Sequence, residues 1–178
     1  MVANIPNKLF DSSAKKITNL SADDLKNLNQ WASKKSGQLL LVGKPGRGKT
    51  CCSIALMRFF DREGIALTDQ HYYFVPDLFE IWKSQMHENW KNYDLLTKLK
   101  EFRVLVLDDM GSKEPSPSFL DFLYVVINHR CLGDDITIYT SNLNSKEMND
   151  SFGGRIVSRI SEGLILKFEG EDLRQVEF

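Results

Sequence analysis

Residues 43–50 read Gly-Lys-Pro-Gly-Arg-Gly-Lys-Thr and fit the pattern GxxxxGK(S/T). An apolar run at residues 38–42 precedes them and predicts a buried strand, and a helical pattern over residues 49–62 follows. This strand, loop and helix form the context that the motif requires. In such a loop the backbone N–H groups converge on a polyphosphate, and the helix adds its positive end. The motif therefore predicts a phosphate-binding loop, and it weighs against a chance glycine-rich turn.

Every residue of this loop is a candidate nucleotide ligand. Lys49 is expected to reach the terminal phosphates as a point charge, and the Thr50 hydroxyl can ligate Mg²⁺. The candidate nucleotide-binding residues are Gly43, Lys44, Pro45, Gly46, Arg47, Gly48, Lys49, Thr50 and Cys51.

Two adjacent carboxylates, Asp108 and Asp109, follow an apolar run that predicts a strand over residues 103–107. Ligands of open parallel sheets lie at the carboxyl ends of the strands. Asp108 is expected to hold Mg²⁺, directly or through water, and Asp109 to orient or deprotonate the attacking water. Alone, the pair would more simply be a turn. Together with the phosphate loop it indicates a Walker B motif.

The strand predicted over residues 136–140 ends in Thr140-Ser141-Asn142. Asn142 is expected beside Asp108, where its amide could hydrogen-bond the γ-phosphate or the lytic water, the role called sensor 1. A turn or a helix N-cap is the alternative interpretation of this short run.

The whole chain alternates strand-like and helix-like patterns. Such alternation predicts one α/β domain over residues 1–178, with a five-stranded parallel sheet and helices on both faces. Residues 1–36 supply an N-terminal segment and a helix of the same domain. The remaining predicted strands are 71–75 and 164–168, and the predicted helices are 21–35, one that begins at Pro76, 94–100, 118–130, 145–150 and 155–160.

Composition excludes several classes of protein. The 23 basic and 24 acidic residues leave a formal charge of −1, so no global cationic field attracts nucleic acid. No apolar run has the length of a membrane span, and the N-terminus has neither a signal-peptide core nor a transit pattern. A cytoplasmic protein without membrane association is expected. Its three cysteines form no CxxC pair and suit reduced thiols.

The joint order of the motifs resembles the DnaC/DnaI-type replicative helicase loaders and their relatives, the IstB-type transposition ATPases. The matching segments are Ile5-Pro6-Asn7-Lys8, Val75-Pro76-Asp77-Leu78, Leu107-Asp108-Asp109-Met110-Gly111, Ile127-Asn128-His129-Arg130, Thr140-Ser141-Asn142-Leu143 and residues 154–160. The resemblance implies a P-loop NTPase of the AAA+ class with sheet order 5-1-4-3-2 and no separate lid domain. It also implies ATP or ADP with Mg²⁺ as the ligand, with Ile5 and Pro6 near the adenine.

The resemblance further implies self-association, in which an arginine of one subunit completes the neighbour's ATP site. Arg159 is the first candidate for this role in trans, and Arg155 is the second. A planar guanidinium can neutralise charge that develops on the γ-phosphate. The alternative is a surface arginine paired with Glu162 or Glu169.

Two features depart from the family pattern. The phosphate loop begins at Gly43, which leaves no room for a separate N-terminal partner-binding domain, and Asp109 stands where many AAA+ enzymes carry glutamate. The shorter base suggests slow hydrolysis.

The implied partners are a replicative helicase and single-stranded DNA. The region after the second strand carries four aromatic residues among lysines, which suits base stacking: Phe79, Trp82, Trp90 and Tyr93. Acidic neighbours cancel the charge and predict weak binding by one subunit, and Phe79 and Trp82 also have the spacing of core residues. Two other hypotheses stay open: a transposition ATPase that binds duplex DNA, and a nucleotide-gated adaptor with little turnover.

Overall fold

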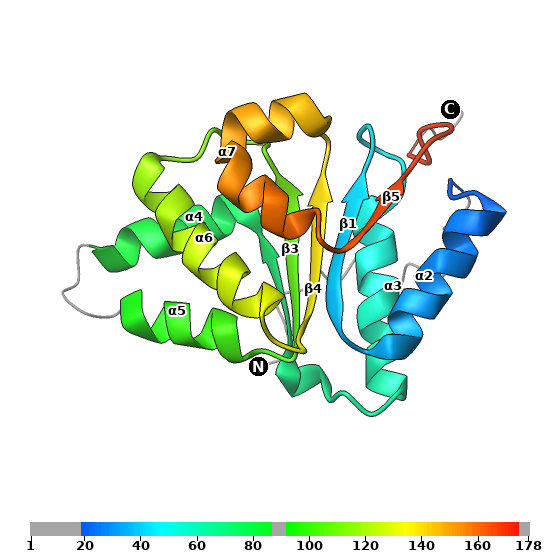
Figure 1. Cartoon of the computed structure of the whole chain (residues 1–178), viewed down its shortest axis with the longest axis horizontal. Coiled ribbons are helices and arrows are strands. Elements are labelled where there is room, and N and C mark those ends of the chain that lie inside the picture. The colour runs from blue at the N-terminus through cyan, green and yellow to red at the C-terminus, as the bar shows by residue number, and fades with distance from the viewer. Residues whose placement is uncertain (1–18, 87–91, 175–178) are drawn as a thin grey trace.

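The computed structural model describes residues 19–86 and 92–174. These residues form a five-stranded parallel sheet with the strand order β2-β3-β4-β1-β5 (Figure 1). Read from the other edge, this is the predicted order 5-1-4-3-2, which is confirmed. The strands are β1 Gly37–Val42, β2 Gln70–Phe74, β3 Val104–Met110, β4 Ile136–Ser141 and β5 Leu164–Lys167.

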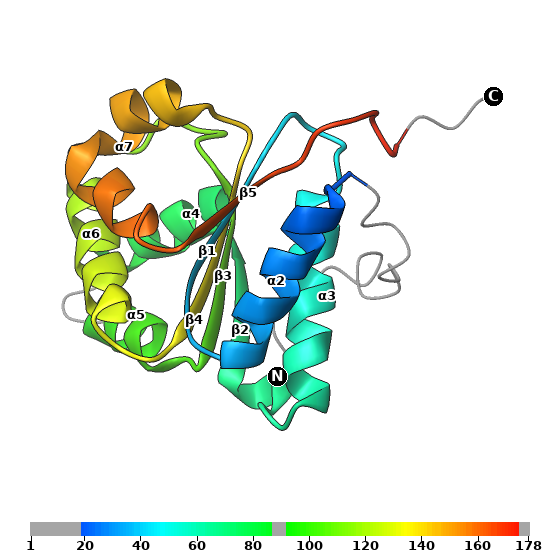
Figure 2. The same cartoon turned by 45° about the vertical axis from the view of Figure 1, so that its right-hand side comes forward.

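Helices cover both faces of the sheet, as predicted (Figure 2). Two of them, α2 and α3, lie on one face, and the other four lie on the opposite face. The helices are α2 Ala22–Lys34, α3 Lys49–Arg62, α4 Val75–Met86, α5 Asn92–Glu101, α6 Pro117–Cys131 and α7 Ser145–Ile160, and a 3₁₀ turn, η2 Leu67–Asp69, precedes β2.

The central strands are apolar on both faces, which is why they read as continuous hydrophobic runs. Successive side chains of a strand point to opposite faces. In β1, Leu39 and Leu41 pack under α2 and α3, whereas Leu40 belongs to the core under α4 to α7. Two cores, one on each face, therefore hold the sheet and leave its carboxyl edge free for polar side chains.

Helix starts follow the capping rules. The Ser21 side chain accepts the Asp24 N–H at 3.1 Å, and Asn144 with Glu147 forms a reciprocal capping box at the start of α7. The two helices predicted over residues 145–150 and 155–160 are joined as α7, which kinks at Gly153, where φ is 76°. Val75, predicted in the second strand, instead begins α4. Valine favours strands, but Pro76 follows it and favours the first turn of a helix, so Val75 becomes the first residue of α4.

Phe79 and Trp82 belong to the core and are not free for base stacking. Their rings lie 5.0 and 5.3 Å from the Phe119 ring of α6, and Trp82 is buried. Their core-like helical spacing is therefore confirmed for Trp82, and Phe79 packs against the same core while partly buried. Trp90 and the side chain of Tyr93 lie outside the described part of the chain.

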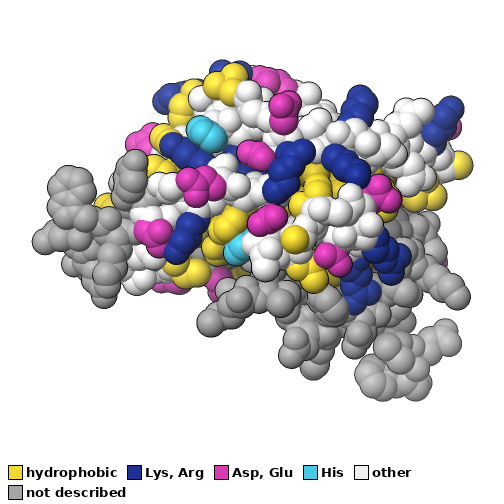
Figure 3. Space-filling model, turned by 90° about the horizontal axis from the view of Figure 1, so that it is seen from below, with side chains coloured by type: hydrophobic (Ala, Val, Ile, Leu, Met, Phe, Trp, Pro, Cys, Tyr) yellow, Lys and Arg dark blue, Asp and Glu magenta, His cyan; other side chains and the backbone are white. Residues whose placement is uncertain are grey.

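The face at the amino ends of the strands carries charges of both signs. Figure 3 shows Lys and Arg side chains interspersed with Asp and Glu on this face. Salt bridges at this edge include Lys35 with Glu63 at 3.2 Å and Arg103 with Asp135 at 3.3 Å. Among the described residues of this face, such mixing leaves no continuous cationic patch for a phosphate backbone. Among the described helices, none is both long and apolar enough to cross a bilayer.

Candidate functional site

The phosphate loop connects β1 to α3 at the carboxyl edge of the sheet (Figure 1). Two of its glycines, Gly46 and Gly48, have left-handed φ angles of 79° and 95°. At Gly46 the left-handed φ favours glycine, and a Cβ there would lie 1.8 Å from Asp172 Oδ1, so the Asp172 side chain would have to move. Gly48 directly precedes Lys49, the first residue of α3, which places the positive end of this helix at the loop.

The Lys49 ammonium connects the loop to the end of β4. Its Nζ donates to Gly43 O at 2.6 Å, Lys44 O at 2.9 Å and Asn142 Oδ1 at 2.6 Å. Burial lowers the pKa of Lys49, while the charges of Asp109 and Asp108 oppose that shift. The structure therefore joins Asn142 to Lys49, whereas the sequence had predicted only that Asn142 lies beside Asp108.

Asp108 lies at the centre of a group of hydroxyls. Thr50 Oγ1 is 2.9 and 3.1 Å from its two carboxylate oxygens, Thr140 Oγ1 is 2.7 Å from Oδ1, and Tyr72 Oη is 2.6 Å from Oδ2. Burial, followed by the Asp108 charge, raises the pKa of Tyr72 well above its usual range, so the phenol is protonated and donates. Asp108 and Thr50 thus meet, which places both predicted Mg²⁺ ligands side by side.

A break in β3 brings Asp109 to the same site. Neighbouring residues of a regular strand point to opposite faces, so Asp108 and Asp109 could not share one. The β3–β4 register shifts between Leu107 and Met110, and Asp109 has a left-handed φ of 61°. The Asp109 N–H donates to Thr140 Oγ1 at 2.9 Å, and its Oδ1 accepts the Asn142 amide at 2.8 Å. Bulges commonly re-aim side chains beside active sites.

A cavity of about 700 Å³ opens over these residues. Its walls combine the phosphate loop and Cys51 with residues of β2 and α4 and with a segment after β5. Among the lining residues are Arg47, Lys49, Thr50, Cys51, Tyr72, Phe74, Asp77, Ile81, Asp108, Asp109, Asn142, Leu173 and Arg174. The volume suits a nucleotide-sized ligand.

The oxygen donors of Thr50 and Asp108 suit Mg²⁺. In the described residues, His, Cys, Asp and Glu form no group of three or more that could hold a metal ion by itself. Mg²⁺ in nucleotide sites takes only one or two protein oxygens and completes its shell with phosphates and water. The chemistry of the donors therefore fits a metal bound together with a nucleotide.

The segment after β5 reaches back over the phosphate loop, which the sequence did not predict. The Leu173 N–H donates to Gly46 O at 2.9 Å. The Asn19 amide donates to Arg47 O at 3.3 Å and Glu171 O at 3.0 Å. Arg174 also lines the cavity.

The two candidate arginines do not line the cavity of their own subunit. Arg155 lies over the Tyr124 ring, with its Cζ 4.0 Å from the centroid, and Arg159 pairs with Glu162 at 2.8 Å. This is the surface pairing that the sequence left open for Arg159. Ile5 and Pro6 lie outside the described residues.

Comparison with known families assigns the chain. Residues 8–162 match the family of IstB-like ATP binding proteins. The chain belongs to the IstB-like ATP-binding family. No curated protein matches this IstB-like chain at a significant level.

Solved structures show the same fold. A crystal structure of DnaI superposes with a TM-score of 0.79 at 20% identity, covering 94% of this chain and 96% of that one. The DnaC helicase loader gives 0.78 at 23% identity, covering 92% and 100%. AMPPCP-bound DnaA from Aquifex aeolicus gives 0.72 at 16% identity, covering 87% and 50%. The IstB-like chain therefore has the AAA+ core fold shared by DnaI, DnaC and DnaA.

Proposed function

We propose that this chain hydrolyses ATP and uses that cycle to load or remodel a replicative helicase on single-stranded DNA. One observation carries the hydrolytic part: Lys49, Asp108, Asp109 and Asn142 converge at one edge of the sheet. Lys49 donates to Asn142, Asn142 donates to Asp109, and the Thr140 hydroxyl links Asp109 to Asp108. The loader part is supported by the likeness to the DnaC helicase loader over the whole of that chain. In this proposal residues 1–178 act as a single domain.

The side chains divide the work of phosphoryl transfer. Lys49 would leave the carbonyls of Gly43 and Lys44 and bind the terminal phosphates of ATP or ADP. Thr50 and Asp108 would hold Mg²⁺, which when bound neutralises charge on the phosphate oxygens. Asp109 would orient or deprotonate the attacking water, and Asn142, already bonded to Asp109, would hold the γ-phosphate or that water in line.

Self-association would add an arginine from a neighbouring subunit to the ATP site. Arg159, or Arg155 in second place, would enter the ATP site of a neighbouring subunit. This proposal is supported by the observation that neither arginine lines the cavity of its own subunit. Arg159 would exchange its ion pair with Glu162 for the γ-phosphate, which costs little because exposed ion pairs contribute about 0–1 kcal/mol.

A second candidate function follows from the family match. An IstB-like transposition ATPase would bind duplex DNA in ATP-dependent assemblies and would not bind a helicase. Adding duplex or single-stranded DNA to the ATP-bound protein separates the two functions. Assembly on duplex alone would favour transposition, and assembly on single strands would favour loading.

The first experiment measures equilibrium binding of ATP and ADP to the wild type and to Lys49→Ala. Lys98→Ala, which removes an exposed lysine of α5, is the control. Loss of the Lys49 charge should weaken binding roughly 100-fold, in line with loss of a charge-assisted contact of about 3 kcal/mol. The same samples are sized with and without single-stranded DNA. Absence of nucleotide binding in the wild type would overturn the proposal.

A further inference from the structure

Tyr72 is a buried tyrosine whose hydroxyl contacts a carboxylate of the site. The residue is 5% exposed, and its Oη lies 2.6 Å from Asp108 Oδ2. In the parallel pairing of β2 with β3, Tyr72 lies opposite Val106, two residues before Asp108. Side chains two residues apart share a face, so the Tyr72 ring lies on the Asp108 side of the sheet and its hydroxyl reaches forward to the carboxylate.

The three hydroxyls around Asp108 differ in what holds them. Tyr72 and Thr140 belong to β2 and β4, the strands on either side of β3. Thr140 is held further, because its Oγ1 accepts the Asp109 N–H at 2.9 Å. Thr50 lies instead in the first turn of α3, beside the phosphate loop, where its hydroxyl would turn to Mg²⁺.

One hydroxyl is therefore exchangeable and two are fixed. If Thr50 turns away, Tyr72 still holds Oδ2 and Thr140 still holds Oδ1. Each carboxylate oxygen has about two lone-pair positions, so each keeps one for the metal or its water. The pair of fixed donors restricts the carboxylate to one rotation.

We propose that Tyr72 is a positioning residue, which fixes the Asp108 carboxylate in the orientation that binds nucleotide-associated Mg²⁺. This inference rests on the proposed nucleotide site and deepens it. Partners that orient a metal ligand matter in general, since their loss costs about 10–100-fold in metal affinity or activity. The alternative is that Asp108 only provides a hydrogen-bond acceptor for the buried Tyr72 hydroxyl. In that case, removal of the hydroxyl would not change Mg²⁺ binding.

The test is Tyr72→Phe, which keeps the ring and removes only the hydroxyl. ADP binding is measured at equilibrium in EDTA and then across a Mg²⁺ titration. We expect unchanged affinity in EDTA and about a tenfold rise in the Mg²⁺ concentration that gives half of the metal-dependent tightening. Thermal unfolding of the same samples reports stability.

Tyr139→Phe is the matched control. Tyr139 is also buried and its hydroxyl also donates to a buried side chain, Gln38, but it does not contact Asp108. Its Mg²⁺ dependence should equal that of the wild type even where stability falls. In an Asp108→Asn background, adding Tyr72→Phe should produce no further change in the Mg²⁺ dependence of ADP binding, because the carboxylate that the hydroxyl orients is gone.

Three results would overturn the inference. The first is a Tyr72→Phe variant whose Mg²⁺ dependence matches the wild type. The second is equal weakening with and without Mg²⁺, which would assign Tyr72 a purely structural role. The third is a Mg²⁺ shift of the same size in Tyr139→Phe. A wild type that binds no ADP in either condition would instead sink the nucleotide site itself, and that outcome is distinct from the other three.

Discussion

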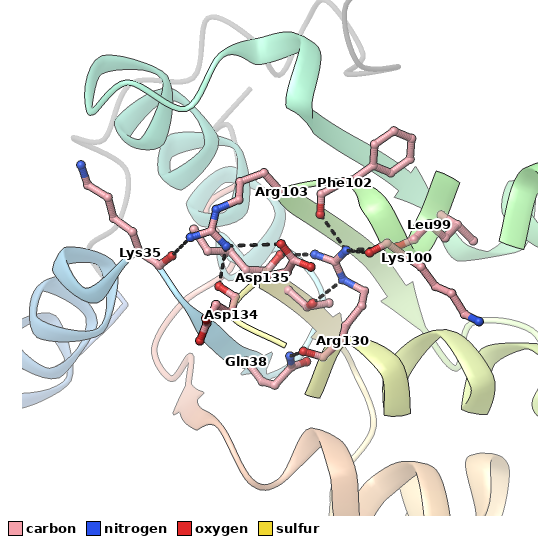
Figure 4. A network of polar contacts seen from close by, with 11 residues as sticks. Lys35, Gln38, Leu99, Lys100, Phe102, Arg103, Arg130, Asp134 and Asp135 are labelled. Atoms are coloured by element: carbon pink, nitrogen blue, oxygen red, sulfur yellow. Dashed lines mark hydrogen bonds and ion pairs between the residues drawn. The ribbon is translucent and has the colours of Figure 1, made fainter. Parts of the chain in front are cut away.

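Two buried charges lie at opposite ends of the same central strands. Asp108 lies at the carboxyl end of β3, is 4% exposed and lines the cavity. Arg130 lies in α6 near the amino ends of β3 and β4 and is fully buried. Figure 4 shows Arg130 among backbone carbonyls that come from several elements.

The partners of the two charges differ in kind. Arg130 donates to Phe102 O at 2.7 Å, Ile136 O at 2.8 Å, Leu99 O at 3.0 Å and the Thr137 hydroxyl at 2.7 Å. Burial lowers the pKa of Arg130, and Asp135 opposes this. The Leu99 carbonyl lies in the last turn of α5, where helix carbonyls lack partners within the helix, and a cation there satisfies it.

The comparison separates a structural charge from a site charge. Arg130 donates mainly to backbone carbonyls, and α5 and β4 hold these carbonyls in place. Asp108 is bound by side-chain hydroxyls, one of which lies on the phosphate loop's helix, and it faces a cavity. Burial alone therefore does not identify a functional group, whereas exchangeable partners and an adjoining cavity do.

The largest effect is expected for Arg130→Met. Loss of the guanidinium leaves several buried carbonyls without donors, so the free energy of unfolding should fall by about 3–5 kcal/mol. Denaturant unfolding measures it. Arg103→Met, at a neighbouring arginine with a 36% exposed side chain, is the control and should cost much less. Equal losses for both arginines would contradict the special place given to Arg130.

Next in size is Asp109→Asn, which tests the charge of the candidate base. Turnover of ATP should fall roughly 100-fold or more, the usual contribution of a general base. Stability should not change, because asparagine tolerates the left-handed φ of this position. Steady-state hydrolysis and thermal unfolding are measured together.

Asp109→Glu sharpens the same test. Glutamate restores a base with one more methylene but pays about 1–2 kcal/mol for the left-handed backbone. We therefore expect a less stable protein without faster turnover. A stable and faster Asp109→Glu variant would show that the bulge of β3 does not favour aspartate.

A smaller stability effect is expected for Asp108→Asn. The amide oxygen can still accept one hydroxyl, and removal of a buried charge offsets the lost bond, so the free energy of unfolding should change by less than about 1 kcal/mol. Mg²⁺ should no longer tighten ADP binding. A stability loss as large as that of Arg130→Met would erase the distinction between the two charges.

The smallest effect is expected for Glu162→Gln. The Arg159–Glu162 pair is 35% and 50% exposed, so its loss should leave the denaturation midpoint at the wild-type value. Chemical denaturation of the isolated subunit measures this. A clearly lower midpoint would show that Arg159 has a structural role and would weaken its assignment to a neighbour's site.

Much of the fold and the central residues of the candidate site could be predicted from local sequence patterns. The strand order came from the resemblance to a family and not from the local pattern. The phosphate loop is contiguous, and buried parallel strands read as apolar runs, so residues 43–50 and the positions of the strands could be predicted. Tyr72 could not, because its contact depends on the register of β2 against β3 and on the forward reach of a side chain. The hydrogen bond from Leu173 to Gly46 could not be predicted either, because the two residues are far apart in the sequence. The β3 bulge at Asp109 is set by pairing with β4, and no local pattern marks it.

The reach of residues 170–174 to the phosphate loop bears on how the protein is made. The loop leaves the ribosome before the segments that complete its surroundings. Among the described strands, β1 pairs with β4 and β5, which follow it by many residues, and Gly46 O accepts its hydrogen bond from the Leu173 N–H. Such distant pairings fold slowly, because loop closure precedes any gain. During translation the nascent chain therefore carries the full phosphate-loop sequence without a finished site, and a complete nucleotide site requires that residues 170–174 have emerged.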